Sequence, residues 1–199
     1  MPLWIHGNDH GAQLRPQRSD GDTVHPARLP RCDARRTERG RVTADPRFWQ
    51  PDVTVATVVV DGGRVLVVEE RVAGRLVLNQ PAGHLEPDEP LVEAAVRETR
   101  EETGWDVRLT AFVGAYQWKA PSVSLGGAER TYMRFAFLAE PLHFDPARAL
   151  DDGIVRALWM TPAELQADAA RHRSPLVWRV VADALAGRRF PLDLVTAVT

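Results

Sequence analysis

The sequence predicts an α+β domain in which helices sandwich a mixed β-sheet. Three observations support this fold class. Runs of β-branched residues alternate with turn residues from Val53 onward, an amphipathic helical segment interrupts them, and helical periodicity returns near the C-terminus. The 199 residues show no internal repeat and no second apolar core.

We expect two parts, a tail at residues 1–46 and a folded domain at residues 47–199. The tail is rich in Arg, Pro, Asp and Gly and has the period of neither a helix nor a strand, which predicts disorder. Its arginines leave a basic arm for RNA as an alternative to a solvated extension or an over-extended start of the coding sequence.

The folded part should begin with a β-hairpin. The run VTVATVVV and the run RVLVVEE flank the turn signal Asp61-Gly62-Gly63. The segment RLVLNQPAGHLE predicts a short strand that enters a loop, where Pro81 and Gly83 end the strand pairing. Further strands are expected at residues 107–118, 130–140 and 154–160.

A central helix is predicted from about Leu91 to Thr103. Asp88 is the expected N-cap, Pro90 is tolerated in the first turn, and Gly104 suits the position just past the end. The core-facing stripe would comprise Val92, Ala95, Val96, Thr99 and Thr103.

Two more helices are expected after the last strand. The first follows the N-cap candidate Thr161, and the second, in SPLVWRVVADALAG, ends at Gly187.

Three glutamates, Glu98, Glu101 and Glu102, crowd into an arc of roughly 100° on the central helix. Like charges at these spacings repel and do not stabilise a helix, and Arg97 and Arg100 are expected to project from a different sector. A hard divalent cation would compensate the charge, because Mg²⁺ prefers oxygen ligands. The crowding therefore favours a metal site over a merely solvated helix flank.

Residues 83–105 read G-x5-E-x7-R-E-T-x-E-E-x-G-W. This pattern resembles the signature box of the Nudix hydrolases. Thr99 and Trp105 stand where an aliphatic residue is usual, which affects packing and leaves the charged positions intact. Segments outside the box, over about residues 52–195, are similar to the NudJ type of Nudix phosphatase.

The resemblance implies the Nudix fold and a site that uses Mg²⁺, or alternatively Mn²⁺. It implies metal ligation by Glu98, Glu101, Glu102 and the backbone carbonyl of Ala82. One glutamate, Glu98 in preference to Glu101, would accept the proton of the attacking water.

Other box residues would support this chemistry. Arg97 and Glu89 are expected to pair and hold the loop against the helix. Gly83 would make a sharp turn that brings the backbone near the metal, and Gly104 would end the helix.

A further carboxylate could come from the pair Asp151 and Asp152, of which we take Asp152; an acidic turn is the alternative.

For substrate binding we expect Tyr116, Trp118 and Lys119, in YQWKAP. An aromatic ring can stack on a base or a pyrimidine ring, and Lys119 can meet a phosphate. Alternation along a strand would send some of these side chains into the core instead.

The implied function is Mg²⁺-dependent hydrolysis of phosphoanhydride bonds in nucleoside di- and triphosphates and in thiamin-type pyrophosphates. Alternatives are a pyrophosphatase for oxidised nucleotides or dinucleotide polyphosphates, an enzyme that trims RNA 5′ ends, and a non-catalytic Nudix-fold regulator. The intact box glutamates count against the last of these.

Composition narrows the partners. The net charge of −2 argues against a protein built to grip nucleic acid, and no apolar run reaches the roughly 20 residues of a membrane span. The single cysteine, Cys32, cannot form an intramolecular disulfide, which fits a cytoplasmic protein. We expect small-molecule substrates and a monomer or dimer.

Overall fold

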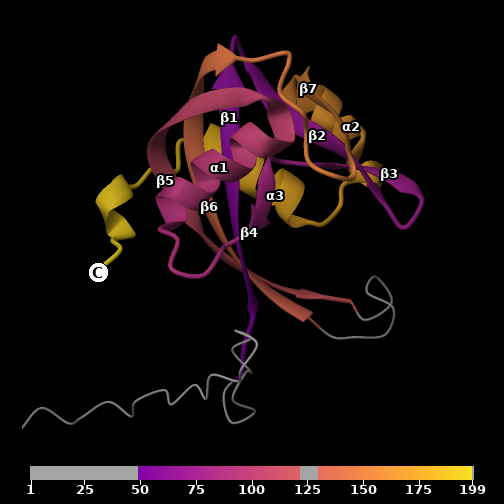
Figure 1. Ribbon diagram of the computed structural model, residues 1–199. Coiled ribbons are helices and arrows are strands. Elements are labelled where there is room, and N and C mark those ends of the chain that lie inside the picture. Colours follow the sequence, from indigo (N-terminus) through magenta and orange to yellow (C-terminus); the bar gives the residue numbers. More distant parts are fainter. Residues whose placement is uncertain (1–48, 122–129, 199) are drawn as a thin grey trace, which may run out of the picture. The chain divides into compact units, whose positions relative to one another are not determined.

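The computed structural model describes residues 49–121 and 130–198 (Figure 1). The predicted tail at residues 1–46 lies outside this part of the chain. The strands are β1 (Asp52–Asp61), β2 (Arg64–Val72), β3 (Arg75–Asn79), β4 (Ala82–His84), β5 (Trp105–Ala120), β6 (Arg130–Phe144) and β7 (Ile154–Met160). The helices are α1 (Leu91–Thr103), α2 (Pro162–Ala167) and α3 (Leu176–Leu185), with single 3₁₀ turns η2 (Ala169–Arg171) and η3 (Leu192–Leu194).

The sheet is mixed, as predicted. β1 runs parallel to β6 and antiparallel to β4, and β6 pairs with β5 in a long antiparallel ladder. β1 also forms the expected hairpin with β2, which carries β3 and β7 on its two sides. Strand β1 therefore lies at the centre and brings β4, β6 and β2 together.

Helices cover both faces of this sheet (Figure 1). On one face, Ala94 and Ala95 of α1 pack with Val55 of β1. On the other face, Val177 and Val180 of α3 belong to the larger apolar cluster. Because successive side chains of a strand point to opposite faces, the apolar run of β1 supplies both cores. Among the described residues, no helix is both long and apolar enough to span a membrane.

Two local predictions are wrong. Gly83 does not end strand pairing, since it lies within β4 and pairs with Val55. Asp88 does not cap α1, because its backbone is left-handed (φ 63°) in the preceding turn, and Pro90 is the N-cap without a side-chain hydrogen bond. By contrast, α1 has the predicted bounds, and Thr161 caps α2 in a reciprocal capping box with Glu164.

Candidate active site

Three glutamates of α1, namely Glu98, Glu101 and Glu102, lie against β4 and the loop that precedes β7. Glu98 and Glu102, one helical turn apart, are both buried, whereas the side chain of Glu101 is 40% exposed. Carboxylate oxygens of Glu98, Glu101 and Asp151 all lie within 4.8 Å of one another. Three acidic groups therefore converge on one point, although Asp151 follows Glu101 by 50 residues.

Gly83 permits this approach. A Cβ atom at this position would overlap the carboxylate of Glu98. The glycine is therefore required by the close approach of a side chain to the strand, and the sharp turn predicted from the sequence is absent.

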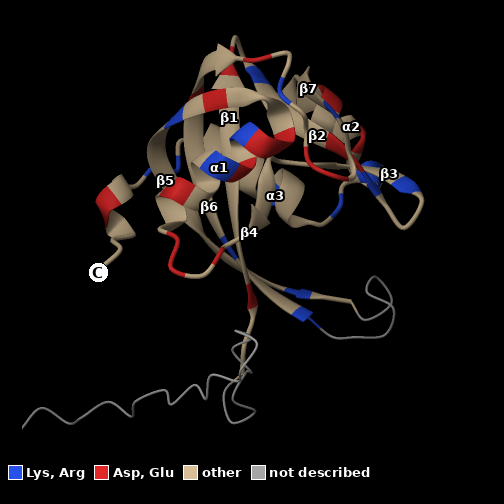
Figure 2. Cartoon of the chain, in the orientation of Figure 1, with Lys and Arg blue, Asp and Glu red and all other residues tan. Residues whose placement is uncertain are grey.

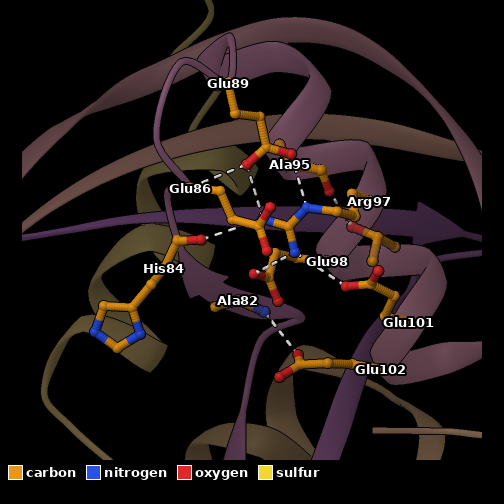
Figure 3. Close-up of polar contacts among 10 residues, drawn as sticks. Ala82, His84, Glu86, Glu89, Ala95, Arg97, Glu98, Glu101 and Glu102 are labelled. Carbon is orange, nitrogen blue, oxygen red and sulfur yellow. Dashed lines mark hydrogen bonds and ion pairs between the residues drawn. The ribbon is translucent and has the colours of Figure 1, made fainter. Parts of the chain in front are cut away.

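Arg97 ties the site together (Figure 3). Its Nε and Nη2 donate to the two carboxylate oxygens of Glu89 at 2.7 and 2.8 Å, which is the predicted pair. Its Nη1 also donates to Glu98 Oε1 at 2.8 Å and to Glu101 Oε2 at 3.0 Å. The expectation that Arg97 projects away from the glutamates is wrong, because the long side chain reaches Glu98 and Glu101 on its own helix. Figure 2 shows the acidic and basic residues close together on α1.

Glu102 is as enclosed as Glu98 and has a different hydrogen-bond partner. Its Oε2 accepts a hydrogen bond from the backbone N–H of Ala82 at 2.8 Å (Figure 3). The pKa of Glu102 is raised to about 8, mainly by burial and also by the charges of nearby Glu70, Glu98 and Asp151, against the hydrogen bond from Ala82. Burial likewise raises the pKa of Glu98, against the hydrogen bond from Arg97. Enclosed carboxylates of like charge are costly unless a cation joins them.

The late acidic pair contributes through Asp151. Its backbone N–H donates to the carbonyl of Glu101, and its carboxylate belongs to the converging group. Asp152, the residue taken from the sequence, lines the adjoining cavity but is not part of that group. The choice of Asp152 over Asp151 is therefore not supported by the geometry.

A cavity of about 320 Å³ adjoins the carboxylates. Trp118 lies in its wall and stacks on Tyr132, with ring centroids 5.6 Å apart and planes inclined by 21°. Of the three predicted substrate residues, only Trp118 lies here. Tyr116 donates its hydroxyl hydrogen to Asp183 of α3 at 3.0 Å, and Lys119 lines a separate groove with Trp49.

The sequence analysis did not predict several polar residues of the cavity wall, among them Glu70, Asn79, Arg134 and Arg173. Arg173 pairs with Glu70, and burial raises the pKa of that carboxyl. Arg134 interrupts the apolar run YMRFAFLA of β6 with a buried charge, and this interruption was the signal in the sequence. Among the described residues, Glu70 Oε1 and Asn79 Oδ1 are buried without a hydrogen-bond partner.

These residues fit a hard divalent cation. The converging ligand atoms are all carboxylate oxygens, which Mg²⁺ and Mn²⁺ accept. Glu98, Glu101 and Asp151 would hold such an ion, with Glu102 beside them. The cavity next to the carboxylates offers room for a small phosphorylated molecule.

A family model described as the NUDIX domain matches residues 50–179. The chain is 40% identical over 148 residues to the protein named Phosphatase NudJ from Escherichia coli strain K12, covering 74% of this chain and 92% of that protein. The relative of the same name from Shigella flexneri matches equally well.

Solved structures agree with this match. A NUDIX hydrolase from Nitrosomonas europaea superposes with a TM-score of 0.71 at 44% identity, covering 75% of this chain and 98% of the other. A UDP-X diphosphatase, with a TM-score of 0.55 and 15% identity, covers 71% of this chain and 66% of its own and shares the fold.

Proposed function

This chain belongs to the NUDIX hydrolase family and is a phosphohydrolase, and we propose that it cleaves phosphoanhydride bonds of nucleoside di- and triphosphates and of thiamin-type pyrophosphates with Mg²⁺. The observation that carries the proposal is the convergence of Glu98, Glu101 and Asp151 beside a cavity. We assign the hydrolase domain to residues 47–199.

The carboxylates would share the work as follows. Glu98, Glu101 and Asp151 would hold the ion together with the neighbouring Glu102, and the backbone carbonyl of Ala82 is the further ligand that the family resemblance implies. When bound, Mg²⁺ neutralises the diphosphate and makes a nearby water molecule more acidic. Four carboxylates would provide the negative charge that retains a divalent ion, and the ion would in turn attract the anionic substrate.

Glu98 is our choice for the base that accepts the proton of the attacking water. Its carboxylate lies between Gly83 and Arg97, in the interior of the site, whereas Glu101 is partly exposed. Arg97, held by Glu89 through two hydrogen bonds, fixes the orientation of the Glu98 carboxylate. Orientation of a base by a neighbouring ion pair is the expected supporting role.

Substrate choice is supported by the cavity and by the relatives. The stacked pair Trp118 and Tyr132 offers an aromatic surface to a base or a pyrimidine ring. The relatives of 40% identity are named as phosphatases, which favours attack at a terminal phosphorus. Nucleoside phosphates and thiamin-type pyrophosphates share a planar ring and a phosphoanhydride chain.

A hydrolysis panel tests the proposal. Purified protein with Mg²⁺ is given nucleoside di- and triphosphates, thiamin pyrophosphate, an oxidised guanine nucleotide, a dinucleotide polyphosphate and triphosphorylated RNA, and orthophosphate and pyrophosphate are measured separately. We expect orthophosphate from several nucleotides and from thiamin pyrophosphate. Hydrolysis restricted to the oxidised nucleotide, the dinucleotide or the RNA would contradict the assignment.

A further inference from the structure

We propose that Arg134 binds the phosphoryl group that adjoins the one held at the carboxylates, so that the diphosphate spans the metal site and this guanidinium. The inference rests on the proposed function, since it assumes a diphosphate or triphosphate substrate. It adds a substrate-binding residue that lies outside residues 83–105, on a different strand.

The position of Arg134 is costly for a cation. It lies in β6 and is 8% exposed. Its Nε donates to Thr54 Oγ1 at 3.5 Å and its Nη1 to Gln80 Oε1 at 3.3 Å, both long hydrogen bonds. Within residues 49–121 and 130–198, no carboxylate lies at ion-pair distance from it. Burial lowers the pKa of Arg134 to about 10, so the side chain stays charged near neutral pH.

Two other arginines near the site, unlike Arg134, have carboxylate partners. Arg97 pairs with Glu89, and Arg173 pairs with Glu70. A guanidinium has five N–H donors in a planar fork that matches phosphate geometry. Burial of a charge without a close partner of opposite charge lowers the stability of the fold, because the lost hydration is not replaced. The donors of Arg134 that lack protein acceptors are therefore available to an anion in the cavity.

Strand register places Arg134 between the carboxylates and the aromatic pair. Thr54 of β1 is the register partner of both His84 in β4 and Arg134 in β6. Tyr132 precedes Arg134 by two residues in β6, about 7 Å away along the strand, and it is the register partner of Trp118 in β5. The cavity thus presents carboxylates, then a guanidinium, then stacked rings. A ring-bearing diphosphate has its groups in the same order.

The rival explanation is structural. Glu102 and Glu70 attract Arg134 through space, and the guanidinium could serve only as their counter-charge. However, Glu70 already has Arg173, and Glu102 accepts the N–H of Ala82. The two explanations differ in what they expect of a neutral replacement. A counter-charge should stabilise the fold, whereas an anion-binding residue should be dispensable for it.

Calorimetric titration with α,β-methylene ADP and Mg²⁺ tests the inference, because this analogue cannot be cleaved between its phosphorus atoms. The variants are Arg134→Met and Arg134→Lys. Arg108→Met is the matched control, since Arg108 is exposed and pairs with the exposed Glu140. Thermal unfolding of each variant is measured without ligand.

We expect Arg134→Met to bind the analogue about 10- to 100-fold more weakly, with a Tm no lower than that of the unaltered chain. Arg134→Lys keeps the charge and should lose less affinity. Arg108→Met should bind normally. Affinity within twofold of the unaltered chain for both Arg134 variants would overturn the inference, as would absent binding by the unaltered chain. If Arg134→Met does not fold, the Lys variant decides by the same criterion.

This result is separable from the hydrolysis panel. Normal hydrolysis by the unaltered chain together with normal binding by both Arg134 variants would remove the inference and leave the proposed function. If the Arg134 variants bind the analogue more weakly but the unaltered chain hydrolyses nothing in the panel, the proposed function is removed and the role of Arg134 in diphosphate binding is kept.

Discussion

Glu98, Glu101 and Glu102 of α1 have different surroundings, and these determine what each carboxylate can do. Glu98 and Glu102 are buried, with one contact to Arg97 and one to the N–H of Ala82 respectively. Glu101 is partly exposed and shares Arg97 with Glu98. Because the enclosed pair lacks a full set of hydrogen-bond donors, it gains most from a bound cation.

Replacement of Glu102 by Gln is the most direct test of metal binding. The amide keeps the shape of the side chain and removes a charged ligand, so we expect kcat to fall by at least about 100-fold. The fold should persist, because a buried carboxyl whose pKa is raised to about 8 is costly when ionised. Steady-state kinetics and thermal unfolding check both statements. A variant with near-normal kcat would refute the metal assignment.

Replacement of Gly83 by Ala acts on the same site through sterics. The added methyl group would overlap the carboxylate of Glu98, which must then move. We expect a loss of kcat of at least about tenfold, since small misplacement of a catalytic group is costly. Kinetics and a Mg²⁺ titration of the Gly83→Ala variant provide the measurement. Unchanged kcat would show that Glu98 does not need its present position.

At the scale of elements, the second glycine of the pattern has a different task. Gly104 ends α1 in a left-handed conformation (φ 74°), and its N–H donates to the carbonyl of Arg100. Replacement by Ala should cost about 1 kcal/mol of unfolding free energy, with a much smaller loss of kcat than in Gly83→Ala. Urea unfolding and kinetics of the two variants give this comparison. Equal effects of both on kcat would contradict the division of roles.

Helix α3 is attached to β5 through a charged residue. Asp183 accepts hydrogen bonds from Tyr116 and Arg179, both at 3.0 Å. Burial alone would raise the pKa of Asp183, but these hydrogen bonds outweigh it and hold the pKa below its ordinary value. The contribution to stability is therefore present above the unfolded pKa and is lost as the pH falls through the folded value.

We accordingly expect Asp183→Asn to be less stable than the unaltered chain by about 1 kcal/mol near neutral pH. The difference should shrink in acid, because protonation removes the same charge from the unaltered protein. Urea unfolding of both proteins, at neutral pH and in acid, measures this difference in unfolding free energy. Glu140→Gln is the control, since its exposed pair with Arg108 should contribute little at either pH. A difference that does not depend on pH would exclude the electrostatic explanation.

At the scale of the whole molecule, local signals and long-range signals were predictable to different degrees. The bounds of α1, the shared face of Glu98 and Glu102 and the pair of Arg97 with Glu89 depend on residues close in sequence, and all three are present. Helical geometry alone predicts that Glu98 and Glu102 share a face, and the signature pattern predicts the pair of Arg97 with Glu89.

Residues that reach the site from distant strands were not predictable in this way. Arg134 arrives because β6 pairs in parallel with β1, a contact over 80 residues, and Asp151 arrives through the loop before β7. Alternation in β5 correctly warned that some aromatic residues face the core, but the sequence does not say which face meets the cavity. Trp118 and Tyr116 share one face of β5, yet only Trp118 reaches the cavity.

The crowding of acidic groups also predicts how the whole domain responds to metal. A ligand that binds only the folded state stabilises it by about 2.7 kcal/mol at 100 times its dissociation constant. Mg²⁺ should therefore raise the Tm of the unaltered chain, and excess EDTA should reverse the increase. The Tm of Glu102→Gln should rise much less, because one of the carboxylates beside the converging group is gone. Glu140→Gln, altered far from the site, should respond like the unaltered chain.

Equal shifts of Tm in all three proteins would mean that Mg²⁺ acts on the surface in general. The crowding of Glu98, Glu101 and Glu102 on α1 would then need an explanation other than metal binding.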